Sequence, residues 1–129
     1  MAGETDLSRM LATLAVSRRP DTYTFVTGEW PLLAPVAAAT IREDEGPTYV
    51  VTVEQARSFG APVEFEAVWL SLTVHSSLEA VGLTAAFSGA LAAAGIACNV
   101  LAGYHHDHLL VPTELADEAI VVLGSLSSR

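Results

Sequence analysis

The residues with the clearest capacity for chemistry form one polar run near the C-terminus, His105-His106-Asp107-His108. Imidazole and carboxylate groups are common metal ligands, so a metal site is one interpretation of this run. However, consecutive side chains in a tight turn point apart, and no two of these histidines have the four-residue helical spacing that aims both rings at one ion. The other interpretations are a solvated polar hairpin and a turn that contacts a ligand. We predict no metal here and expect His105 to contact a ligand.

A second candidate for chemistry is the run His75-Ser76-Ser77, which places an imidazole beside two hydroxyl groups. Nucleophilic catalysis needs a base within hydrogen-bond reach of the hydroxyl, but the histidine beside a serine in sequence is rarely its partner in space. The chain contains no Gly-x-Ser-x-Gly turn and no glycine-rich phosphate-binding motif. We therefore predict that the protein is not an enzyme and needs no cofactor.

The same serines lie where a strand is expected to pass into a helix. Residues 67–74 are rich in β-branched and aromatic side chains, which predicts a strand. Residues 81–94 carry apolar side chains at helical spacing, and Gly95 is placed to end that helix. Ser76 or Ser77 can cap the helix, and Glu79 has the spacing of a capping box with Ser76. Free backbone N–H groups at such a helix start can bind a carboxylate.

The other predicted elements complete a β-α-β-β-α order in the second half of the chain. Strands are expected at 96–102 and 108–112, and a last helix at about 113–126. In the first half, the pattern predicts a helix at 7–16, a turn at Arg18-Arg19-Pro20-Asp21, strands at 23–27, 36–42 and 48–53, and a short helix at 54–59. This order is the ferredoxin-like plan without its closing strand. We predict an α+β fold with antiparallel sheets and helices packed on one face.

The two halves of the chain share a plan, which indicates an internal duplication. Residues 36–56 and 96–116 align without gaps as strand, turn, strand and helix, so that Val51 falls on Val111 and Ala56 on Ala116. Only residues 28–35 separate the first two strands of the first half, which is too short for the corresponding helix. We predict two modules, residues 1–62 and 63–129, of which the first is degenerate. The strand at 67–74 is expected to serve both halves.

The longest pattern in the chain resembles the ACT domain family. It comprises residues 72–83, 95–100 and 104–112, and it is similar, more narrowly, to small bacterial tandem-ACT proteins related to the ACT modules of CASTOR-type arginine sensors. ACT domains bind amino acids at the loop from the first strand to the first helix, commonly between modules, and they commonly pair as dimers. Most carry a Pro-Gly pair in that loop, where this chain has Val81-Gly82.

The resemblance implies a non-catalytic regulatory module that binds a small ligand, expected to be an amino acid, and signals through association. Its ligand-binding positions would be the loop residues and two residues of the following strand: Ser76, Ser77, Leu78, Glu79, Val81, Gly82, Leu83, Asn99 and Val100. Glu79 could pair with a cationic group, which would suit arginine. A homodimer is expected, with an unidentified protein as a further partner. The alternative is a protein-interaction or oligomerisation module that binds no ligand.

Composition narrows the classes of partner. The net charge of −9, from 15 acidic and 6 basic residues, disfavours nucleic acid and anionic membranes, whose binding depends on cationic contacts. Only 16% of residues are charged and 51% are hydrophobic, which favours a surface hidden in a subunit interface. Cys98 is the single cysteine, so no internal disulfide can form. Neither a signal peptide nor a membrane-spanning run is recognisable, and we expect a cytoplasmic protein.

Overall fold

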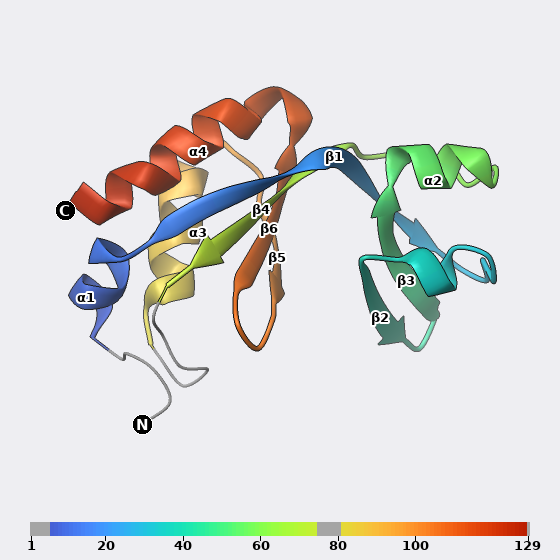
Figure 1. Cartoon of the computed structure of the whole chain (residues 1–129), viewed down its shortest axis with the longest axis horizontal. Helices are drawn as coiled ribbons and strands as arrows, with labels where there is room; N and C mark the ends of the chain where they lie inside the picture. The colour runs from blue at the N-terminus through green and yellow to red at the C-terminus, as the bar shows by residue number, and fades with distance from the viewer. Residues whose placement is uncertain (1–5, 75–80, 129) are drawn as a thin grey trace.

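The strands form one antiparallel sheet in a computed structural model that describes residues 6–74 and 81–128. The strand order is β2-β3-β1-β4-β6-β5. The strands are β1 (Ala15–Thr27), β2 (Ala39–Glu43), β3 (Gly46–Thr52), β4 (Ala67–Thr73), β5 (Asn99–Ala102) and β6 (Asp107–Pro112). The sheet is strongly curled, so that β2 and β3 form one wing and β5 and β6 the other (Figure 1). The predicted α+β class is confirmed, with one continuous sheet in place of separate sheets.

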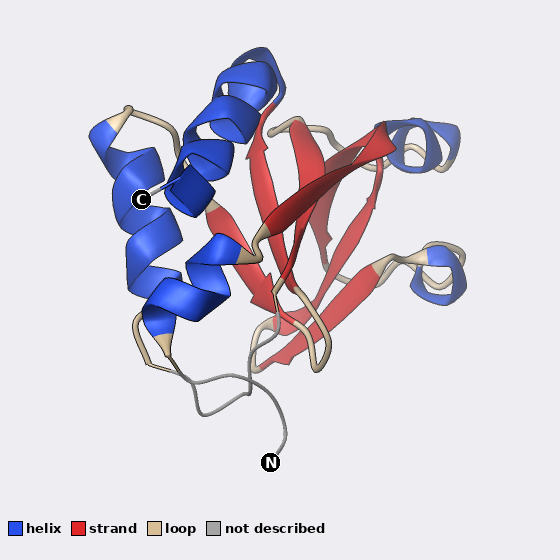
Figure 2. Cartoon of the chain, turned by 60° about the vertical axis from the view of Figure 1, so that its left-hand side comes forward, coloured by secondary structure: helices blue, strands red, loops and turns tan. Residues whose placement is uncertain are grey.

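The helices pack against one face of this sheet. They are α1 (Leu7–Ala12), α2 (Val53–Ser58), α3 (Leu83–Ala93) and α4 (Ala116–Ser125), with 3-10 turns η1 (Ala34–Val36), η2 (Thr113–Leu115) and η3 (Leu126–Ser128). α1, α3 and α4 cluster over the half of the sheet formed by β4, β6 and β5, and α2 lies apart from them beside β3 (Figures 1 and 2). None of the helices in the described residues has the length and apolar character needed to cross a membrane.

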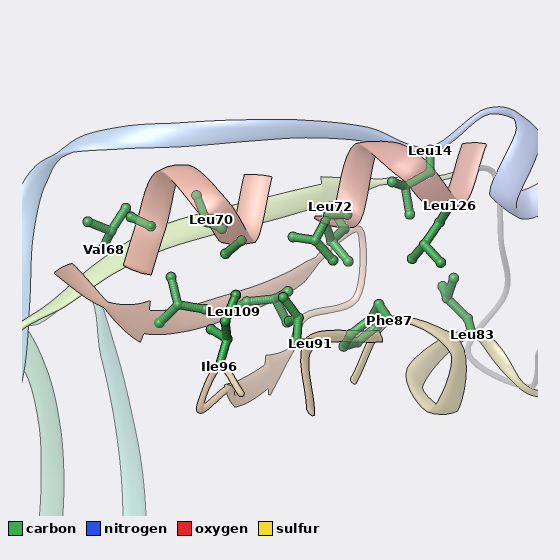
Figure 3. Close-up of a cluster of buried hydrophobic side chains, with 14 of the residues drawn as sticks. Leu14, Val68, Leu70, Leu72, Leu83, Phe87, Leu91, Ile96, Leu109 and Leu126 are labelled. Carbon is green, nitrogen blue, oxygen red and sulfur yellow. The ribbon is translucent and has the colours of Figure 1, made fainter. Parts of the chain in front are cut away.

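The largest core lies between the helices α1, α3 and α4 and the sheet (Figure 3). Alternate residues of β4 point toward the helices, and Leu70 and Leu72 are fully buried there with Leu109 of β6. Phe87 and Leu91 of α3, four residues apart on one helical face, close the core from the other side. The apolar stripe that predicted this helix is therefore the stripe that holds it on the sheet.

Strand β1 departs from the sequence-based prediction. The first helix ends at Ala12 rather than at residue 16, and the predicted turn around Pro20 lies inside a strand of 13 residues. The pairing of β1 with β4 shifts register between Arg18 and Thr22, so the proline occupies an irregular stretch of the ladder. Proline has no backbone N–H to donate, and a bulge is one of the few places in a sheet that tolerates it.

β1 and β4 join the two halves of the chain. Residues Tyr23 to Thr27 of β1 pair with β3, whereas the residues from Ala15 to Tyr23 pair with β4. β4 in turn pairs with β6, so it serves both halves as predicted. Between β1 and β2 the chain forms the 3-10 turn η1, while α3 occupies the corresponding place between β4 and β5. The first module therefore lacks the helix, as the sequence predicted.

The ends of α3 are set by two glycines. At the C-terminus, Gly95 has a φ of 74° and donates its backbone N–H to Ala92 O, while Ile96 donates to Leu91 O. These two bonds form a Schellman motif, and Gly95 ends the helix as predicted. At the other end, Gly82 is the N-cap, with a φ of 99°. The predicted caps Ser76 and Ser77 lie outside the described residues, and the helix begins at Leu83, later than predicted, because its capping position is Gly82.

Candidate functional site

The predicted ligand loop joins the end of β4 to the start of α3. Its residues Ser76, Ser77, Leu78 and Glu79 lie outside the described residues. Of the others, Val81 is 83% exposed, whereas Leu83 is 5% exposed and belongs to the core beneath the helices. Leu83 can therefore offer a ligand its backbone N–H but not its side chain.

Gly82 gives the start of α3 its particular geometry. The residue has a positive φ, and a Cβ at this position would lie 3.3 Å from Leu7 Cδ2 of α1. α1 thus packs against the start of α3 and leaves room for glycine. The first turn of α3 contains no acidic residue, so its own side chains do not neutralise the positive end of the helix dipole.

The remaining predicted residues lie at different distances from this loop. β5 is an edge strand and β6 separates it from β4, so Asn99 and Val100 are not on the strand next to β4. Asn99 pairs with Leu110, which pairs with Trp69, four residues before the last residue of β4. At about 3.3 Å per residue, Asn99 is displaced by about 13 Å along the strand direction from the end of β4, and it also lies two strands to the side. The exposed His105, by contrast, is on the β5–β6 hairpin, at the end of the sheet where β4 leaves it.

A polar and aromatic cluster occupies the face of the sheet opposite the helices. It consists of Arg19 and Tyr23 from β1, Trp69 and Ser71 from β4, and His108 from β6, and we call it the concave-face cluster. The Arg19 guanidinium carbon lies 4.0 Å from the centroid of the Trp69 ring, and its Nη1 donates to Tyr23 Oη at 3.4 Å. Trp69 Nε1 lies 3.2 Å from both Ser71 Oγ and His108 Nδ1, which are themselves 2.8 Å apart.

The sequence did not predict this cluster; it placed only His108 in a polar run and Trp69 in the strand at residues 67–74. The five residues come from three strands, and direct cross-strand pairs such as Ser71 with His108 bring them together. Alternation along each strand could have assigned each residue to a face. It could not have aligned the strands with one another.

The surroundings of His108 favour its neutral form. Burial is the largest cause of its lowered pKa, followed by the positive charges of Arg19 and His106, while Asp107 opposes the shift. Burial also raises the pKa of the Asp107 carboxyl, which His108 partly offsets. The half-buried Cys98 thiol has its pKa raised by burial, which makes the reactive thiolate scarcer.

Replacing His108 with asparagine is expected to reduce the loss of stability at mildly acidic pH. Because the folded pKa of His108 lies below its unfolded value of 6.5, the unfolded chain binds more protons once the pH falls through 6.5. The stability that neutral His108 contributes is therefore complete above pH 6.5, and it is lost as the pH falls toward the folded pKa. Asp107 has the opposite effect on stability. Because its folded pKa is raised above the unfolded value of 3.8, its contribution to stability is lost as the pH rises from 3.8 toward the folded pKa. Calorimetric Tm values from about pH 7.5 to 5.5 should fall less steeply for His108→Asn than for the parent.

The matched control for this measurement is His105→Asn, which changes an exposed histidine on the same hairpin. Its Tm should follow the slope of the parent protein. Parallel slopes for all three proteins would contradict the inferred coupling between His108 ionisation and folding.

Two open grooves lie elsewhere on the surface. A groove of about 670 Å³ runs between the β1 bulge and α2, lined by Asp21, Glu54, Glu66 and Arg57 among others, with Arg57 Nη2 3.9 Å from Glu66 Oε2. A second, of about 410 Å³, lies beside the β2–β3 hairpin. Neither is lined by a residue of the predicted site. Within residues 6–74 and 81–128, no group of three or more His, Cys, Asp or Glu side chains is placed to hold a metal ion.

Known protein families match this chain along nearly its whole length. Two models of the ACT domain match it in tandem, one over residues 2–68 and the other over residues 64–125. No curated protein matches the chain.

Several solved structures share the fold. A Vibrio cholerae protein of unknown function, described as a possible transport protein, is 40% identical, with a TM-score of 0.85 over 94% of this chain and 95% of that one. The ligand-free regulatory subunit of aspartate kinase from Thermus thermophilus has a TM-score of 0.64 at 13% identity, over 89% of this chain and 98% of that chain. A protein from Agrobacterium tumefaciens has a TM-score of 0.65 at 15% identity, over 89% of this chain and 90% of that chain.

Proposed function

The chain belongs to the ACT domain family, and from this premise we propose that it is a non-catalytic regulatory module that binds an amino acid at the loop formed by residues 75–83. Binding changes how the protein associates with itself or with a partner. The division into modules at residues 62 and 63, a homodimeric state and a cytoplasmic location are parts of the same proposal.

The observation that carries the proposal is the glycine at the start of α3. Gly82 adopts a left-handed conformation that other residues rarely adopt, and it precedes a helix of 11 residues whose first turn has no acidic side chain. The backbone N–H groups of that turn suit the carboxylate of an amino acid. The exposed Val81 offers apolar surface beside it.

A thermal-shift screen of the twenty amino acids tests the proposal directly. A ligand that binds only the folded state stabilises it by about 2.7 kcal/mol when its concentration is a hundred times the Kd. We expect one or a few amino acids to raise the Tm, and arginine is the first to test because of the resemblance to CASTOR-type sensors. The same samples, analysed by light scattering, should change in mass with the active amino acid. A flat screen at millimolar concentrations contradicts amino-acid binding.

A ligand-free interaction module is the second candidate. It is favoured by large apolar side chains that are exposed on the described surface, among them Leu32 at 67%, Tyr104 at 78% and Val121 at 71%. This candidate predicts a flat amino-acid screen together with self-association that depends on protein concentration alone.

A further inference from the structure

The face of the sheet away from the described helices carries a cation held over aromatic rings. Arg19 lies on β1 above Trp69. Tyr23 lies further along the same strand, with its ring centroid 5.2 Å from that of Trp69. Tyr23 and Trp69 are only 5% and 2% exposed, so they form a rigid floor. Arg19 as a whole residue is half-buried above that floor.

Arg19 has no acidic partner among the described residues, unlike two other arginines. Arg18 Nη1 lies 2.8 Å from Asp117 Oδ1, and Arg57 contacts Glu66. The hydrogen bond that the structure gives to the Arg19 side chain goes to Tyr23 Oη and uses one of five N–H donors. In a chain of net charge −9, the guanidinium of Arg19 therefore keeps most of its donors available for an external acceptor.

The neighbouring histidine adds no second positive charge. Trp69 Nε1 can only donate, and the Ser71 hydroxyl is 2.8 Å from His108 Nδ1, so Nδ1 is the acceptor in this network. The proton of the neutral ring is then assigned to Nε2. The lowered pKa of His108 agrees with this neutral form. The cluster thus combines one permanent positive charge with uncharged hydrogen-bonding groups.

We propose that the concave-face cluster is a second binding site, which takes a small carboxylate on the Arg19 guanidinium, over the floor of Trp69 and Tyr23 and beside Ser71 and His108. The planar fork of arginine matches the two oxygens of a carboxylate. A single cation beside a neutral imidazole favours an anion with one charge over a phosphate with two. The site lies on the opposite face of the sheet from α3, and the inference does not rest on the proposed function of the loop.

The indole N–H of Trp69 is a direct reporter of this site in a ¹⁵N-labelled sample of the full chain. The chain has two tryptophans, and Trp30→Phe assigns their indole signals; Trp30 Nε1 donates to Thr27 O at 3.1 Å, away from the cluster. Titration with sodium acetate at constant ionic strength, at about pH 7.5, is expected to shift the Trp69 signal with saturation at a Kd of about 1–10 mM. Inorganic phosphate should give a weaker response.

Variants of single arginines establish where the anion binds. Arg19→Gln should weaken acetate binding at least tenfold, and Arg19→Lys, which keeps the charge but loses the fork, should weaken it about threefold to tenfold. Arg42→Gln is the matched control, because it removes an exposed arginine on β2 and should leave the titration unchanged. If Arg19→Gln fails to fold, Arg19→Lys and the parent protein decide the outcome.

Three results would overturn the inference. A Trp69 signal that drifts linearly to about 100 mM acetate, together with that of Trp30, would show that no site exists. A titration of Arg19→Gln equal to that of the parent protein would remove Arg19 from binding, and tighter binding of phosphate would refute the preference for a carboxylate. None of these results bears on the loop, because a Tm increase with an amino acid that persists in Arg19→Gln supports the proposed function independently.

Discussion

Replacing Phe87 with alanine is expected to lower the free energy of unfolding by about 3–5 kcal/mol. Phe87 is fully buried and is among the largest side chains of the core between α3 and the sheet (Figure 3). Its removal costs the transfer free energy of the ring and leaves a cavity that the surrounding leucines fill only in part. Because whole domains are stable by about 5–15 kcal/mol, this loss is a large part of the total.

Urea denaturation measures this effect, with the midpoint expected to fall while the m-value stays constant. Val121→Ala is the matched control. Val121 lies on α4, one of the helices that cover the same core, but it is 71% exposed, so truncation should change stability by no more than about 0.5 kcal/mol. A loss below about 1 kcal/mol for Phe87→Ala would contradict the packing of α3 on the sheet.

Replacing Gly82 with alanine is expected to abolish most of the Tm increase caused by the active amino acid. Alanine at this position would have to adopt a φ of 99°, and its Cβ would lie 3.3 Å from Leu7 Cδ2, so the start of α3 must move. The backbone N–H groups that we propose as the carboxylate site would move with it. The left-handed conformation alone should lower the free energy of unfolding by about 1–2 kcal/mol. Thermal shifts with and without the amino acid separate this loss of stability from the loss of binding.

Two further variants identify the cause of the lost ligand response in Gly82→Ala. Gly89→Ala changes another glycine of α3, whose φ is not positive and whose new Cβ would meet nothing within 4 Å. It should raise stability by up to about 1 kcal/mol and leave the ligand response intact. Leu7→Ala combined with Gly82→Ala removes the close contact but not the strained φ. If Gly82→Ala alone keeps the full ligand response, the loop is not the binding site.

The elements that the sequence predicted well are those in which one local pattern decides the structure. The β-branched and aromatic run of β4 is buried on both faces of the sheet, and the apolar stripe of α3 faces one core, so burial and local pattern agree. The residue that ends α3 needs a positive φ, which glycine adopts readily, and Gly95 has a φ of 74°.

Strand β1 shows where local reasoning fails. Pro20-Asp21 is a sequence typical of a turn, and the preceding apolar residues suit a short helix. In the structure, pairing with β4 keeps this segment extended, and two additional residues of β1 are accommodated between Arg18 and Thr22. Contacts with a strand almost fifty residues away therefore determine the conformation, and no pattern within the segment records them.

The candidate sites divide in the same way. The loop at residues 75–83 could be put forward from sequence because it is continuous and belongs to a family pattern, and as a ligand site it stays a prediction. The concave-face cluster could not, because Arg19, Trp69 and His108 become neighbours only once the register of β1, β4 and β6 is known. Asn99 shows the same limit, since its distance from the loop depends on the order of the strands.

The way in which β1 divides its pairing has a consequence for fragments of this protein. Neither half contains a complete sheet, because the ladder between β1 and β4 crosses from one to the other. A protease that nicks the connection between α2 and β4 would break the peptide chain but not that ladder. The two pieces would remain associated, and reconstitution from separate fragments would require both, since each supplies the missing neighbour of the other's exposed edge.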